Sequence, residues 1–158
     1  MGEAKVAAAI KRRAYAMARV HELINDPAIL PAFVGSFYNH VSLSAFFSNP
    51  DNVICLEGPG AMIFAAIPDK PGWYDAHYIF PRAPGGMVLD AARRCVREMF
   101  VNYDALVLCG CTPRSNRAAR LINRALGAEP KGESVDSLGR PVVFYALERA
   151  KWMARHAD

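Results

Sequence analysis

Two residues capable of acid–base chemistry alternate along one apolar stretch, WYDAHYIF at residues 73–80. Because side chains alternate between the two faces of a strand, Asp75, His77 and Ile79 are expected to share one face. Histidine has an ordinary pKa of about 6.5, so His77 can accept a proton near neutral pH, with Asp75 orienting it or acting through a water. We therefore predict Asp75 and His77 as catalytic residues. The alternative is that both lie on the solvated face of a sheet and do no chemistry.

The same stretch leads into a turn rich in Pro and Gly, PRAPGG at residues 81–86, which precedes a helical pattern. The first turn of a helix carries N–H groups without partners and the positive end of the helix dipole, and glycines let an anion approach the backbone. This predicts a phosphate site on the amides of Gly85, Gly86 and Met87. Arg82 would add positive charge. The alternative is a tight strand-to-helix connection in which the glycines serve geometry alone.

Two segments resemble the motifs of one enzyme family. RAPGGM at residues 82–87 resembles the [QR]-x-x-G-x-[GA] pyrophosphate loop of the Gcn5-related N-acetyltransferase (GNAT) superfamily. SNRAARLINRALGAEP at residues 115–130 resembles the N-x-x-A…L-G segment of the same superfamily. The predicted order of elements agrees with that family from about residue 50 to residue 148. The resemblance therefore implies a GNAT-like fold over most of the chain.

The resemblance also implies a site for acetyl-CoA. The turn at residues 82–87 would hold the pyrophosphate of coenzyme A, and Asn116 would contact the pantetheine side. The strand that ends near Ile79 would separate from the next strand of the sheet. The acyl-pantetheine arm would then lie in the gap beside Ile79.

The function implied is an acetyl-CoA-dependent N-acetyltransferase, with direct transfer to the amine of a small molecule or peptide in a ternary complex. Such a transfer needs a base for the ammonium proton, and Asp75 and His77 are the candidates. The segment NDPAILPAFVG at residues 25–35 is similar to a phage-associated branch of acetyltransferase-like proteins. Nothing in the sequence identifies the acceptor.

Two residues depart from the family pattern. Met87 stands where the family has Gly or Ala, and Asn123 stands where a Tyr often protonates the leaving thiolate. An amide cannot donate a proton in that role. A second hypothesis is therefore a catalytically weak or inactive acetyltransferase-like module, such as a phage or prophage structural or assembly component. Tyr74, Tyr78 and Tyr145 are candidates for the missing acid if they reach the thiolate.

The elements that would position these residues follow from the apolar patterns. Four apolar runs are predicted as strands, at residues 52–57, 61–68, 73–80 and 105–111. One or two further strands are expected after them, the clearer at residues 141–148. Helices are predicted at residues 3–24, 87–100 and 115–126, the last with Ser115 as N-cap and Gly127 as its stop. This order predicts an α+β fold with a mixed, mostly antiparallel sheet, a strand–helix–strand crossover and helices on both faces.

A chain of 158 residues with 53% hydrophobic and 22% charged residues fits one compact domain spanning residues 1–158. Within it we expect N-terminal helices and an acceptor-side or lid region at 1–50, the sheet core at 51–148 and a charged tail at 149–158. The apolar and aromatic residues of 25–50 fit a hydrophobic acceptor, a lid or a homodimer contact equally well. A third hypothesis is a protein-interaction domain that uses the basic helix at 3–24.

Charge and cysteine content exclude several classes of function. The net charge of +4 is small and the basic residues are dispersed, so we expect no nucleic-acid partner. No apolar run approaches the roughly 20 residues of a membrane span, so we expect no membrane partner. The four cysteines are Cys55, Cys95, Cys109 and Cys111. They lack the spacing of a zinc site, so we expect no metal site. We predict that they are buried reduced thiols in a cytoplasmic protein.

Overall fold

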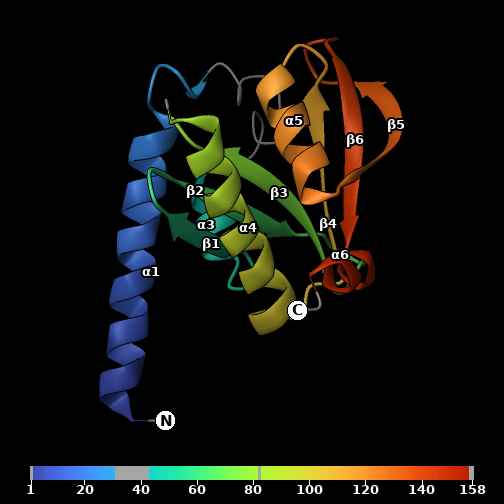
Figure 1. The fold of residues 1–158 in the computed structure, drawn as a ribbon. Coiled ribbons are helices and arrows are strands. Elements are labelled where there is room, and N and C mark those ends of the chain that lie inside the picture. Colours follow the sequence, from blue (N-terminus) through green and yellow to red (C-terminus); the bar gives the residue numbers. More distant parts are fainter. Residues whose placement is uncertain (1, 31–42, 82, 157–158) are drawn as a thin grey trace.

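The computed structural model describes residues 2–30, 43–81 and 83–156 (Figure 1). Six strands within these residues form one sheet, in the order β1-β2-β3-β4-β6-β5. The strands are β1 Val53–Glu57, β2 Gly60–Ala66, β3 Trp73–Ile79, β4 Val107–Pro113, β5 Glu129–Val135 and β6 Pro141–Glu148. The helices are α1 Glu3–Ile24, α3 Leu43–Ser48, α4 Gly85–Asn102, α5 Arg117–Leu126 and α6 Arg149–Arg155.

The sheet is mostly antiparallel, which confirms the predicted α+β fold. Strands β1, β2 and β3 form an antiparallel meander, and β6 pairs antiparallel with both β4 and β5. Only β3 and β4 run parallel, because α4 carries the chain back across the sheet between them. Strand β5 is the second of the one or two final strands that the sequence predicted.

Two helix predictions need correction. The N-cap of α5 is Asn116 and not Ser115, because the Asn116 side chain accepts a hydrogen bond from the Ala119 N–H at 3.1 Å. The predicted charged tail at 149–158 contains helix α6, because Trp152 is buried against Phe100 with ring centroids 5.5 Å apart. An aromatic anchor of this kind outweighs the polar character of its neighbours.

Helices cover both faces of the sheet, as predicted. Helices α4, α5 and α6 lie on one face, where Met62, Phe64, Met99 and Phe100 form the centre of the main core. Helices α1 and α3 lie on the other face over β2 and β3, where Val20 and Phe46 pack against Ile63 and Ile79. The part of that second face formed by β4 and β6 carries only a small apolar cluster, which includes Val107, Cys109 and Ala146.

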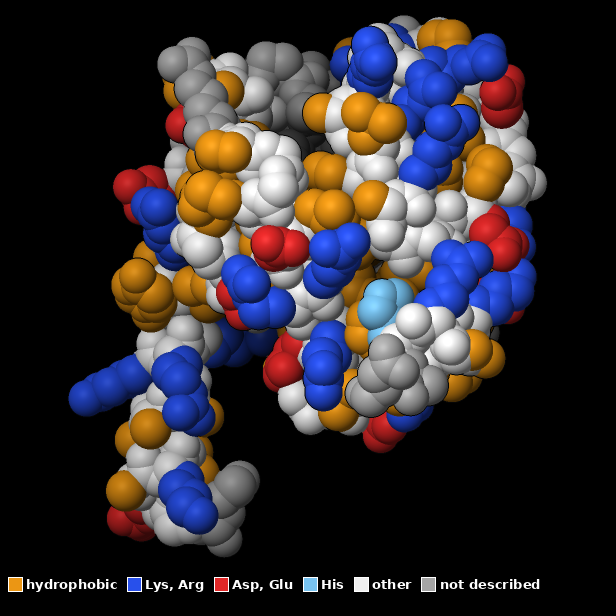
Figure 2. Space-filling model, viewed as in Figure 1, with side chains coloured by type: hydrophobic (Ala, Val, Ile, Leu, Met, Phe, Trp, Pro, Cys, Tyr) orange, Lys and Arg blue, Asp and Glu red, His pale blue; other side chains and the backbone are white. Residues whose placement is uncertain are grey.

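The start of α1 stands clear of the rest of the molecule (Figure 2). Residues 2–12 are all exposed, whereas Val20, Leu23 and Ile24 are buried. Arg13 marks the boundary, because its guanidinium donates to the carbonyl oxygens of Phe47 and Asn49 at 3.0 Å each. Only the second half of α1 therefore belongs to the core. No helix among the described residues is long and apolar enough to cross a membrane.

The parallel pair β3–β4 separates after only three residue pairs. Trp73, Tyr74 and Asp75 pair with Val107, Leu108 and Cys109, and no pair follows. Beyond that point β3 continues along β2 as far as Ile79, and β4 continues along β6 as far as Pro113. Because each strand follows its other neighbour, the sheet opens into a fork. Gly110 lies at its base, where an added Cβ would come within 3.0 Å of the Ala76 carbonyl oxygen.

Candidate functional site

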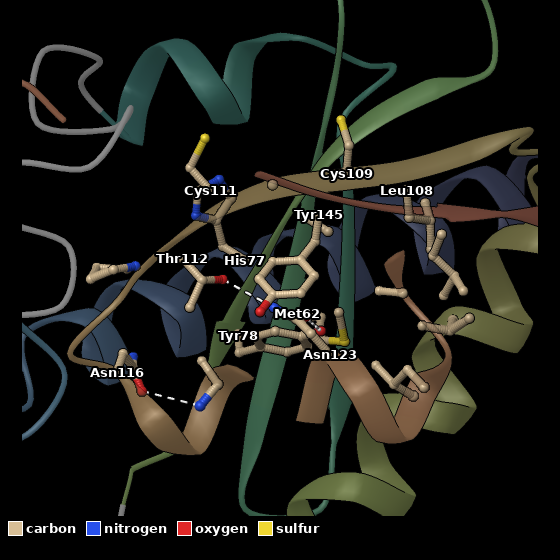
Figure 3. Close-up of a pocket in the computed structure, with 18 residues that line it drawn as sticks. Met62, His77, Tyr78, Leu108, Cys109, Cys111, Thr112, Asn116, Asn123 and Tyr145 are labelled. Carbon is tan, nitrogen blue, oxygen red and sulfur yellow. Dashed lines mark hydrogen bonds between the residues drawn. The ribbon is translucent and has the colours of Figure 1, made fainter. Parts of the chain in front are cut away.

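A cavity of about 110 Å³ occupies the fork between β3 and β4 (Figure 3). Its walls come mainly from β3, β4, β6 and α5, and they include His77, Tyr78, Thr112, Asn123 and Tyr145. This volume is smaller than the roughly 300–1,000 Å³ of most small-molecule sites. The cavity therefore fits the inner end of an extended ligand and not a whole ligand.

The register of β3 and β4 decides which side chains face each other across the fork. Asp75 pairs with Cys109, so both lie on one face of the sheet. Two residues further on, His77 and Cys111 extend from that same face. The residues that alternate with these, among them Tyr78 and Thr112, extend from the opposite face of the sheet. Helix α5 lies on that face. Figure 3 shows Cys109 and Cys111 pointing to one side of β4, away from Asn123.

Asp75 and His77 lie together, on the shared face that strand alternation predicted. The distance from His77 Nε2 to Asp75 Oδ2 is 2.9 Å, and the two side chains are 13% and 18% exposed. A carboxylate at this distance fixes the ring orientation and favours the tautomer whose Nε2–H it accepts. The pair has the geometry of an oriented base at the edge of the cavity. Its predicted catalytic role is still a prediction.

A second polar chain crosses the fork on the face of α5. The Tyr78 hydroxyl donates to Asn123 Oδ1 at 2.6 Å, and Asn123 Nδ2 donates to Thr112 Oγ1 at 3.0 Å. Burial raises the pKa of Tyr78 well above its ordinary value, so the phenol is neutral at physiological pH. Asn123 thus links a phenol from β3 to a hydroxyl from β4.

These hydrogen bonds bear on the acid that the family pattern places at the position of Asn123. The sequence analysis predicts Tyr78 as one of three tyrosines that could supply the missing acid. The structure places two of the three, Tyr78 and Tyr145, in the cavity wall. The contact between Tyr78 and Asn123 joins residues 45 positions apart. Local patterns cannot reveal such a contact, and Thr112 was not among the sequence candidates at all.

The predicted phosphate site is the first turn of α4. Its N-cap is Pro84, which provides no side-chain cap, and the N–H groups of Gly85, Gly86 and Met87 donate no hydrogen bond within the described residues. Open space surrounds both glycines, since an added Cβ would meet nothing within 4 Å at either. The Met87 side chain is 53% exposed. The turn therefore offers three free donors to an anion.

The other predicted cofactor residues differ in how they could contact a ligand. Asn116 lines the cavity while its Oδ1 caps α5. The Ile79 side chain is fully buried beneath α1 and α3, so a ligand in the fork could reach only its backbone. Arg82 lies outside the described residues, as do residues 31–42 of the predicted acceptor-side region. The described residues contain no group of three or more His, Cys, Asp or Glu side chains that could hold a metal ion.

None of the four cysteines forms a disulfide in the structure, and two of them are less buried than predicted. Cys95 and Cys109 are buried and Cys55 is half-buried, whereas Cys111 is exposed at the cavity. The prediction was wrong for Cys111 because β4 has passed the last pair with β3 at that position. An apolar run in the sequence does not reveal where a sheet opens.

Comparisons with known proteins relate this architecture to acetyltransferases through structure alone. No family model matches the chain, and no curated protein matches it. A mutant spermidine N-acetyltransferase from Vibrio cholerae aligns with a TM-score of 0.68 over 91% of this chain and 95% of that one, at 12% identity. An acetyltransferase of the GNAT family from Bacillus anthracis aligns with a TM-score of 0.63 over 86% and 90%, at 14% identity.

A third solved structure covers less. The ribosomal-protein-S5-alanine acetyltransferase from Vibrio fischeri aligns with a TM-score of 0.53 at 16% identity, over 59% of this chain. The chain spans only 55% of that enzyme's length. These likenesses establish the fold as that of the GNAT acetyltransferases, which confirms the fold predicted from the sequence. The similarity to a phage-associated branch is still a prediction.

Proposed function

We propose that this chain, which has the fold of the GNAT acetyltransferases, is an acetyl-CoA-dependent N-acetyltransferase. The observation that carries the proposal is the fork between β3 and β4, which opens after Asp75 and Cys109 and holds a cavity lined by polar groups on both faces. A long thioester arm suits a fork of this kind, because its inner end can lie between the strands while the remainder stays outside.

The free N–H groups of Gly85, Gly86 and Met87 fit the phosphate end of acetyl-CoA. Backbone donors at the start of an 18-residue helix attract negative charge, and the open space at both glycines lets the phosphate approach. Asn116, which lines the cavity wall, would contact the arm. When bound, acetyl-CoA would supply the acyl group as an activated thioester.

His77 and Asp75 would remove the proton from the attacking amine. With Nε2–H donated to Asp75, the other ring nitrogen of His77 is the proton acceptor, and the carboxylate stabilises the imidazolium that forms. Both residues lie on the face opposite α5, so the amine would approach the thioester from that face. We propose direct transfer in a ternary complex, with a small molecule or peptide as acceptor.

Tyr78 would return a proton to the leaving thiolate from the opposite face. Its phenol is neutral because burial raises its pKa, and Asn123 fixes its position within the cavity wall. Asn123 would therefore act as a positioning residue, and Tyr78 would take the acid role that Asn123 itself cannot perform.

One observation favours a second candidate, a module that binds acyl-CoA with little transfer. The Tyr78 hydroxyl already donates to Asn123, so it must turn from that acceptor before it can donate to a thiolate. The two candidates differ in turnover and not in binding.

Release of the CoA thiol should be measured with acetyl-CoA and a panel of amines that includes spermidine and peptides with an N-terminal alanine. The proposal expects amine-dependent thiol release that falls about 100-fold in His77→Gln, the loss typical of a missing general base. Tyr15→Phe, which changes an exposed residue of α1 far along the sequence from the cavity residues, is the control variant and should release thiol at the wild-type rate. Saturable acetyl-CoA binding with no release for any amine would favour the second candidate.

A further inference from the structure

The cavity contains a nucleophile that the proposed amine transfer does not use. Cys111 lines the cavity, is exposed, and lies on the same strand face as Asp75 and His77. Asp75 and Cys109 form the last pair of β3 with β4, so His77 and Cys111 lie two residues beyond it, where the strands no longer pair. Thiol, imidazole and carboxylate thus follow one another across the mouth of the fork.

This arrangement has the order of a nucleophile, a base and a group that orients the base. The orienting contact is the 2.9 Å distance from His77 Nε2 to Asp75 Oδ2. Cys109, two residues earlier on the same face, differs because it is buried and its thiol donates to the Tyr74 carbonyl oxygen at 3.5 Å. Of the cysteines, Cys111 alone is exposed, and it lines the same cavity as the oriented His77.

We propose that Cys111 is a self-acylation site, which takes the acetyl group from bound acetyl-CoA when no amine occupies the acceptor face. The inference rests on the proposed function, because it needs the thioester to lie in the fork. An amine and the Cys111 thiol approach that thioester from the same face, so the two acceptors compete for one acyl group.

The step balances without any further reactant. The Cys111 Sγ forms a bond to the acetyl carbon, the bond from that carbon to the CoA sulfur breaks, and the thiol proton passes through His77 to the departing CoA thiolate. One thioester replaces another, so the exchange is nearly neutral in free energy and excess CoA reverses it. An acetyl group on Cys111 would remain with the protein after CoA dissociates.

His77 is needed because Cys111 is a thiol at rest. Although Cys111 is exposed, the cavity wall partly desolvates its thiol, which raises the pKa of Cys111, and the negative charge of Asp75 raises it further. A thiol must lose its proton to attack a thioester, since the thiolate is the nucleophile. A base that lines the same cavity would make that loss possible at neutral pH.

Intact-protein mass spectrometry after incubation with acetyl-CoA, followed by peptide mapping, tests the proposal. We expect one acetyl group on Cys111, at a rate that saturates with acetyl-CoA, falls at least 10-fold in His77→Gln and is suppressed by an amine acceptor. Added CoA should remove the group. Cys55→Ala is the matched control, because Cys55 lies on β1 outside the cavity lining, and this variant should acetylate at the wild-type rate.

Two results would overturn self-acylation alone. One is a protein that binds acetyl-CoA and acetylates an amine but forms no adduct; the other is an adduct equally fast on Cys55 or unaffected by His77→Gln. Absence of acetyl-CoA binding in a direct titration would instead overturn the proposed function, and self-acylation with it.

Discussion

Tyr78 and Asn123 show how one buried hydrogen bond can serve both stability and chemistry. The phenol of Tyr78 and the amide of Asn123 are 2.6 Å apart inside the cavity wall. Removing the hydroxyl leaves a buried carbonyl oxygen without a donor, which costs about 1–3 kcal/mol of folding free energy. It also removes the proton proposed for the leaving thiolate.

The first prediction is that Tyr78→Phe lowers both stability and turnover. Urea unfolding should show a loss of about 1–3 kcal/mol, and kcat should fall about 100-fold while acetyl-CoA affinity changes little. Tyr145→Phe is the matched control, because Tyr145 also lines the cavity but its side chain makes no hydrogen bond with the described residues. Equal losses in kcat for both variants would contradict an acid role specific to Tyr78.

The second prediction concerns alkaline pH. Because the folded pKa of Tyr78 is raised above its value of about 10 in the unfolded chain, its contribution to stability is complete below pH 10 and is lost as the pH rises further. Each unit above pH 10 should remove up to about 1.4 kcal/mol through this group. Unfolding midpoints measured from pH 8 to 11 should therefore fall more steeply for the wild-type protein than for Tyr78→Phe. Parallel curves would show that Tyr78 is not shielded from water.

At the scale of elements, the start of α4 and the fork perform separate tasks in the proposed site. The α4 turn offers backbone donors to phosphate, whereas β3 and β4 hold the groups for proton transfer. A substitution in the turn should therefore change binding without changing the chemistry of bound substrate.

The third prediction uses opposite effects of one substitution on stability and binding. Gly86→Glu should stabilise α4 by about 0.3–1 kcal/mol, since a carboxylate near a helix N-terminus is favourable, and thermal unfolding should shift upward. Acetyl-CoA affinity should fall at least 10-fold, because the same carboxylate repels the phosphates. Gly86→Ala is the control for shape, since its Cβ meets nothing within 4 Å. Unchanged affinity in Gly86→Glu would place the phosphates elsewhere.

Local patterns predicted some of these elements closely. Helical spacing gave α1 its observed bounds, Glu3–Ile24, and strand alternation placed Asp75 and His77 on one face. The fork was implied by the family resemblance but not by local patterns, because it depends on β3 and β4 each following a different neighbour in the sheet. Contacts that cross the fork, such as Tyr78 with Asn123, depend on that opening and are equally hidden from local reasoning.

Over the whole molecule, the sheet and the helices on its two faces form the body from which half of α1 extends. Residues 2–12 are exposed, whereas Val20, Leu23 and Ile24 are buried over β2 and β3. The hypothesis of an interaction helix thus concerns only the exposed first half of α1, because the second half belongs to the core.

The fourth prediction separates these halves. Deleting residues 2–12 should change the unfolding free energy by no more than about 0.5 kcal/mol, because no buried side chain is lost. Leu23→Ala, in the buried half, should cost about 2–5 kcal/mol. Both values come from chemical denaturation monitored by circular dichroism. A large loss on deletion would mean that the exposed turns support the fold.

The central claim, that the fork and the α4 turn together hold acetyl-CoA, is tested most directly by isothermal titration calorimetry of the full chain with acetyl-CoA. The account predicts saturable binding of one acetyl-CoA per chain with a dissociation constant below about 1 mM, equivalent to more than about 4.1 kcal/mol of binding free energy. The absence of saturable heat throughout the millimolar range would contradict it.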